Sequence, residues 1–89
     1  MQPRDRLTTK EMQVAGLVWE GRTNRKIAKA VGTTEQVIKN YLRNTFDKLD
    51  VWSRLELALY VAGHGGANWN QSHTAGNVLE PTLENLDGP

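Results

Sequence analysis

Apolar residues recur three or four positions apart through residues 7–63, and polar or charged residues fill most of the positions between them. This spacing places apolar side chains on one face of an α-helix, so the pattern predicts an all-α domain. Glycines and capping residues divide the pattern into four helices, at about residues 8–20, 24–31, 34–49 and 53–62. Residues 64–89 show no sustained period.

Capping residues support these helix boundaries. Thr8 and Glu11 have the spacing of a capping box, and so do Ser53 and Glu56. In such a box the first side chain caps the helix and the second returns a hydrogen bond. At the other ends the sequence offers capping residues before a helix and glycines after one: Thr23, Thr34, Gly21 and Gly32.

The predicted third helix has two opposed faces. At about 100° per residue, four side chains form one narrow band, which we call the polar stripe: Gln36, Lys39, Asn40 and Arg43. The opposite side would face a core and carries Ile38, Tyr41, Leu42, Thr45 and Leu49. Charge spacing alone favours an ordinary solvated face. A tight turn at residues 32–34 before this helix, however, is typical of a helix-turn-helix.

The predicted last helix is apolar in nearly every direction. Between Leu55 and Ala62 only Glu56 is charged. A helix of this kind must bury more than one face, and a small domain covers only one. We therefore expect a second copy of the chain to cover the other, with a dimer interface that includes Leu55, Leu59, Tyr60 and Ala62.

Charge divides the chain in two. All eleven Lys and Arg residues but only seven of the ten acids lie in residues 1–63, which gives +4 there and −3 in residues 64–89. A basic body with an acidic tail is a modest indication of nucleic-acid binding. We predict a flexible lead-in at 1–6, a DNA-binding domain at 7–63 and a flexible acidic tail at 64–89, mostly disordered because it is rich in Gly and polar residues.

Several function classes find no support. The chain has no Cys, which excludes thiol catalysis, Cys-based zinc sites and disulfides and fits the cytoplasm. No apolar run is long enough to span a membrane. No catalytic constellation or cofactor motif is present, so we expect no enzyme. We expect no metal at His64 and His73, and packing roles for Trp19, Trp52 and Tyr60.

The stretch LTTKEMQVAGLVWEGRTNRKIAKAVGTTEQVIKNYLRNTFDKLDVWSRLELALY, 54 of the 89 residues, resembles the LuxR/GerE-type DNA-binding domain of bacterial transcription regulators. The resemblance implies a four-helix domain whose third helix enters the major groove and whose fourth helix often makes the dimer. Four positions depart from the family pattern. Val37 stands where Thr is common, and Tyr41 where His is common. Thr33 stands where the turn usually carries Ile, and Lys26 where the second helix often carries an acid.

The predicted function is therefore sequence-specific binding of duplex DNA as a dimer, without a cofactor. The resemblance and the spacing assign base contacts to Lys39, Asn40 and Arg43, with Gln36 beside them. Lys48 and Arg54 could instead pair with Glu11 or Glu56 inside the domain. The alternative function is a protein-interaction module of the same fold that binds RNA polymerase or another regulator. The candidate phosphate contacts are Thr9, Asn24, Lys26, Thr34, Tyr41, Lys48 and Arg54.

Overall fold

The computed structural model describes residues 2–70, which contain helices and no strand. The elements follow one another as η1 (Pro3–Arg6), α1 (Thr9–Trp19), α2 (Asn24–Val31), α3 (Glu35–Leu49), α4 (Arg54–Gly63) and η2 (Gly66–Asn68), where η denotes a 3₁₀-helix. The predicted all-α class and all four helices are confirmed, with ends that lie within one residue of the predicted ones. None of the helices is long and apolar enough to cross a membrane, as far as residues 2–70 show.

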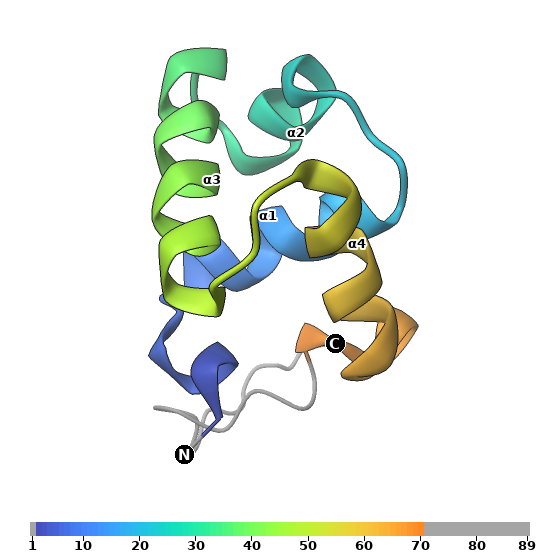
Figure 1. The fold of residues 1–89 in the computed structure, drawn as a ribbon. Helices are drawn as coiled ribbons and strands as arrows, with labels where there is room; N and C mark the ends of the chain where they lie inside the picture. The colour runs from blue at the N-terminus through green and yellow to red at the C-terminus, as the bar shows by residue number, and fades with distance from the viewer. Residues whose placement is uncertain (1, 71–89) are drawn as a thin grey trace.

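Helix α1 lies at the centre of the domain and packs against α2, α3 and α4 (Figure 1). Its buried side chains meet apolar residues from the other helices in one continuous core. Ile38 and Leu42 of α3 are buried in that core, and α4 contributes Leu57 and Val61. The core therefore fixes the orientation of α3, whose opposite side faces solvent.

All four helices begin with the predicted capping residue. The side chains of Thr8, Thr23, Thr34 and Ser53 each accept a hydrogen bond from the backbone N–H three residues on. At α1 the box is complete, because a Glu11 carboxylate oxygen also accepts from the Thr8 N–H at 2.9 Å.

The second predicted capping box is only half formed. Glu56 donates its backbone N–H to the Ser53 hydroxyl, but its carboxylate accepts from the Trp52 N–H. Trp52, just before this cap, is 84% exposed, whereas Leu57 is fully buried.

The turn between α2 and α3 depends on Gly32, which adopts φ +87°. This left-handed conformation is accessible to glycine without a Cβ clash. The N–H groups of Gly32 and Thr33 both donate to the Ala28 carbonyl, at 2.8 and 2.9 Å. Thr34 then caps α3. The predicted helix-turn-helix geometry is therefore present in α2 and α3.

The prediction of a flexible tail from residue 64 is wrong for residues 64–70. This segment forms η2 and returns Trp69 to the core, where its side chain is only 1% exposed. The Trp69 indole N–H donates to the Met12 carbonyl at 2.9 Å. Gly16 leaves room for the ring, since a Cβ there would lie 3.3 Å from Trp69 Cδ1. The remainder of the predicted tail, 71–89, including His73, lies outside the described residues.

The predicted flexible lead-in at 1–6 is likewise wrong for residues 3–6, which form η1. The Arg4 guanidinium donates to the His64 carbonyl at 2.9 Å and lies 5.8 Å from the centre of the Trp69 ring. The two ends of the described chain therefore contact each other and extend the domain beyond residues 7–63.

Two of the aromatic residues expected in packing roles are exposed instead. Trp52 is 84% exposed and Trp19 is 36% exposed. Tyr60 does pack, but it turns toward the C-terminal segment, where its ring stacks on His64 with a centroid distance of 4.0 Å. Trp69 is the tryptophan that is buried in the core, with 1% of its surface exposed.

Candidate nucleic-acid interface

The four side chains of the polar stripe all lie on the solvent side of α3. Ile38, Leu42, Thr45 and Leu49 on the opposite side are buried, as the helical spacing predicts. Within the stripe, the Gln36 side-chain amide donates to the Asn40 carbonyl oxygen at 3.3 Å. Fifteen residues give α3 a length of about 22 Å at 1.5 Å per residue. One long helix therefore presents Gln, Lys, Asn and Arg side chains along an open face.

The N-terminal end of α3 supports this face. Thr34 accepts a hydrogen bond from the Val37 N–H at 3.2 Å, so its hydroxyl is already used for capping. The first N–H groups of a helix have no partner in the helix and form a partial positive charge. Anionic phosphate is favoured at such an end.

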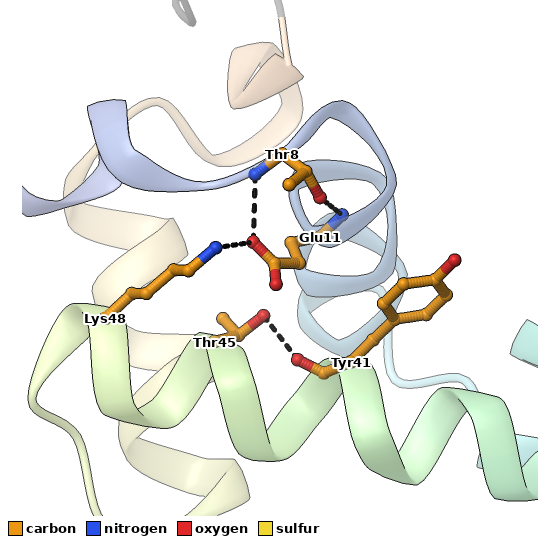
Figure 2. Close-up of polar contacts among 5 residues, drawn as sticks. All are labelled: Thr8, Glu11, Tyr41, Thr45 and Lys48. Atoms are coloured by element: carbon orange, nitrogen blue, oxygen red, sulfur yellow. Dashed lines mark hydrogen bonds and ion pairs between the residues drawn. The ribbon is translucent and has the colours of Figure 1, made fainter.

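Lys48 is held inside the domain. Its ammonium lies 2.8 Å from a Glu11 carboxylate oxygen (Figure 2). The Glu11 side chain is only 4% exposed, and the same oxygen accepts from the Thr8 N–H. A buried carboxylate needs such partners, because an unpaired buried charge is costly. This ion pair, the internal alternative for Lys48, ties the C-terminal half of α3 to the start of α1.

Arg54 also has internal partners. Its guanidinium donates to the Asn24 side-chain oxygen at 2.6 Å and to the Arg22 carbonyl. The contact joins the start of α4 to the start of α2. Asn24 and Arg54 therefore already have a side-chain partner within the domain. Glu56, the partner that the sequence suggested, instead accepts from the backbone at Trp52.

The remaining predicted phosphate contacts differ in exposure. Thr9 and Lys26 are exposed near the starts of α1 and α2. Tyr41 is half-buried and packs against the core, and in Figure 2 its hydroxyl points away from the Glu11–Lys48 pair. Its backbone carbonyl accepts the Thr45 hydroxyl at 2.7 Å, which satisfies the one buried polar side chain of α3.

The predicted dimer residues divide into two groups. Leu55 and Leu59 are 69% and 62% exposed, and Ala62 is exposed beside them. Tyr60 instead belongs to the contact with His64 and Trp69. The exposed apolar surface of α4 is therefore narrower than predicted, because the segment after α4 covers part of it.

The described residues hold no group of three or more His, Cys, Asp or Glu side chains that could bind a metal ion. His64 has its Nδ1 2.8 Å from the Tyr60 carbonyl oxygen, within the helix end and away from the polar stripe.

Comparison with known proteins places these features in a family. Residues 5–61 match the family model described as bacterial regulatory proteins of the luxR family. The chain is 34% identical over 59 residues to the transcriptional regulatory protein LiaR of Bacillus subtilis, covering 66% of this chain and 28% of that protein. It is 41% identical over 51 residues to a monoamine regulon transcriptional regulator of Klebsiella aerogenes, covering 57% and 22%.

A third relative, the probable transcriptional regulatory protein SgaR of Hyphomicrobium methylovorum, is 35% identical over 69 residues, covering 78% of this chain and 31% of that protein. No solved structure gave a significant match. The chain thus spans about a quarter to a third of the length of these relatives.

Proposed function

The chain belongs to the luxR family of bacterial regulatory proteins, and from this premise we propose that it regulates transcription by inserting α3 into the major groove of duplex DNA. The observation that carries the proposal is the two-sided α3: its buried side is fixed by the core, and its open side holds the polar stripe. The major groove admits an α-helix and offers a distinct hydrogen-bond pattern for each base pair.

The side chains of the polar stripe have complementary roles in this mechanism. Arg43 and Lys39 suit the O6 and N7 acceptors of guanine, and Asn40 suits N6 and N7 of adenine, each contact worth about 1–3 kcal/mol of discrimination. Gln36 lies one turn before Asn40 and hydrogen-bonds to it, so it orients Asn40 or reaches the next base. Because α3 is anchored through Ile38 and the rest of its buried side, these groups are preorganised.

Phosphate contacts would fix the position of α3 on the duplex. We assign them to Lys26, Thr9, the Tyr41 hydroxyl and the N-terminal end of α3 at Thr34, which have access to solvent or free N–H groups. Lys48, Arg54 and Asn24 instead serve the scaffold through their internal contacts.

We further propose that two copies associate through α4. The exposed side chains Leu55, Leu59 and Ala62 form the surface for this contact, and contiguous exposed apolar side chains of this kind mark interaction sites. A symmetric dimer would place two copies of α3 on half-sites about ten base pairs apart, or a multiple of that distance. Sedimentation tests this: Leu59→Glu should give a monomer, and a monomeric parent chain on its DNA would contradict the dimer.

Selection of bound sequences from a random duplex pool, followed by fluorescence anisotropy with the full chain, tests DNA binding. Asn40→Ala should lose preference at one base position. Lys26→Ala should weaken all duplexes equally and reduce the salt slope by about 0.9 if it neutralises one phosphate. Arg6→Ala, which removes an exposed cation of η1, is the matched control and should change neither the base preference nor the salt slope. A chain that prefers no sequence over random duplex at moderate salt would refute the function.

One observation favours the alternative function, a module of the same fold that binds RNA polymerase or another regulator. Four of the seven predicted phosphate contacts already have side-chain partners within the domain: Asn24, Thr34, Lys48 and Arg54. Capture of RNA polymerase by a chain that shows no measurable duplex affinity would support this alternative. In either role the protein would act in the cytoplasm of a bacterium.

A further inference from the structure

An open groove of about 380 Å³ lies beside the polar stripe. Its apolar walls are Leu42 and Phe46 of α3 together with Val51 and Trp52 of the loop that follows. Trp52 is the most exposed of the large apolar side chains in the described residues, at 84%. An indole held out of the core at the edge of a groove suits a ligand that buries it, since burying an exposed aromatic ring is strongly favourable.

The rim of the groove carries mainly positive charge. Lys39 and Arg43 line it on the α3 side, and Asp47 is the single acid among the lining residues. The groove therefore combines an apolar floor with two cations at the border of the proposed DNA-contacting face. A segment with apolar anchors and carboxylates between them is complementary to this arrangement.

We propose that residues 79–87 of the same chain, LEPTLENLD, dock in this groove and compete with DNA. In the sequence Leu83 and Leu86 have the i, i+3 spacing of apolar anchors in peptides that bind apolar grooves, and Leu79 adds a third apolar side chain just before Pro81, which cannot lie inside a helix. The same stretch carries three of the ten acids of the chain and no cation, against the net +4 of residues 1–63. The leucines of this segment are Leu79, Leu83 and Leu86, and its acids are Glu80, Glu84 and Asp87.

The length of the intervening chain permits this contact. The step from Asn70 to Leu79 covers nine residues, which extend to about 30 Å. The longest dimension of the domain is 32 Å, so nearly every point of its surface lies within reach. Tethering supplies an effective concentration on the order of a millimolar. A segment that binds with a Kd of only about 0.1 mM would then occupy the groove about nine-tenths of the time.

The competition rests on the proposed function, because the shared residues are the proposed base contacts Lys39 and Arg43. At nine-tenths occupancy the docked segment would weaken duplex affinity about tenfold. The bound DNA would displace the segment, and any event that sequesters the segment would raise affinity.

Docking can be measured without DNA. The chain has no Cys, so Thr82→Cys accepts a single nitroxide label in the full-length protein. We expect the label to broaden the NMR signals of Lys39, Phe46 and the Trp52 indole, and we expect the broadening to vanish when Leu79 and Leu83 are replaced by Ser. Absence of broadening, or broadening centred on α4, would overturn the proposal.

A mixture of labelled protein with isotopically enriched parent chain identifies the source of the segment. If the signals of the enriched chain stay sharp, the segment docks within its own chain. If they broaden, a second copy supplies the segment, and the proposal is overturned.

Affinity tests the regulatory part. Glu80→Gln/Glu84→Gln should tighten duplex binding about three- to tenfold, whereas the matched control Glu20→Gln/Asp5→Asn, which changes the net charge equally, should change it less than twofold. Equal effects in both variants would refute the competition. Spin-label contacts in a protein that binds no duplex in any variant would refute the DNA-binding function and leave docking supported.

Discussion

Trp69 allows the sharpest test of the fold, because sequence analysis placed it in a flexible tail and the structure places it in the core. Its side chain is 1% exposed and donates to the Met12 carbonyl. Replacement of a buried Trp by Ala costs about 3–5 kcal/mol. A domain of this size has a total stability of only about 4–10 kcal/mol. We therefore expect Trp69→Ala to remove about a third of the stability or more.

Urea denaturation and thermal melting followed by circular dichroism measure this loss. For a domain of this size each kcal/mol shifts Tm by about 4–8 °C, so the variant should melt at least about 12 °C below the parent. Trp69→Phe retains most of the apolar contact and loses only the indole donor. It should remain folded and lose about 1–2 kcal/mol, the penalty for leaving the Met12 carbonyl without its partner.

Trp52→Ala is the matched control. It removes the same side chain from a position that is 84% exposed. In a chain whose proposed docking segment is disabled by Leu79→Ser/Leu83→Ser, its effect on stability should therefore stay within about 0.5 kcal/mol. Equal Tm values for Trp69→Ala and Trp52→Ala would refute the reasoning. An unchanged Tm after removal of residues 64–89 would also refute it, because the segment around Trp69 would then lie outside the cooperative unit.

Three further predictions concern particular contacts. Lys48→Met should lower the free energy of unfolding by about 2 kcal/mol in urea titrations, less than the loss of a fully buried ion pair, because Lys48 keeps some solvent contact. An unchanged urea midpoint would show that Glu11 does not need its partner. Burial raises the pKa of Tyr60 above 10.0, against smaller opposing effects of Arg4. The stability from this shift is therefore complete below pH 10 and lost as pH rises through the raised pKa. Because burial outweighs the effects of Arg4 at the Tyr60 hydroxyl, Tyr60→Phe should be neutral or slightly stabilising, and its unfolding free energy should fall less above pH 10 than that of the parent. Gly32→Ala should cost about 1 kcal/mol because φ is +87°; Gly63→Ala, at an open helix position, should be neutral or stabilising, and equal melting of the two would contradict the turn geometry.

The helices and their starts could be predicted because the information is local. A capping side chain and the N–H that it accepts from are three residues apart, and the apolar period of a helix repeats within a few residues. Thr8, Thr23, Thr34 and Ser53 therefore cap where the sequence indicates. The exposure of the polar stripe follows from the same periodicity, since the core covers only one side of α3.

The partners of the polar side chains are a different kind of information. Lys48 meets Glu11 across 37 positions of the chain, and Arg54 meets Asn24 across 30. The sequence offered Glu11 or Glu56 as internal partners for Lys48 and Arg54, and it left open whether these cations pair internally or contact DNA. Only the packing of α1, α3 and α4 brings these groups within hydrogen-bond distance.

Trp52 and Trp69 show why burial itself was mispredicted. Trp52 stands beside two helices and Trp69 stands among Gly and Asn residues, so composition favours burial of the first and exposure of the second. The space along α1 decides which tryptophan is buried, because Gly16 has no side chain where the Trp69 ring lies. The Met12 carbonyl also accepts a hydrogen bond from the Trp69 indole N–H. The core is thereby closed from the C-terminal side, and Trp52 remains free at the edge of α3. The residue that was expected to pack is the one that the proposed docking of residues 79–87 would bury, beside the face proposed to contact DNA.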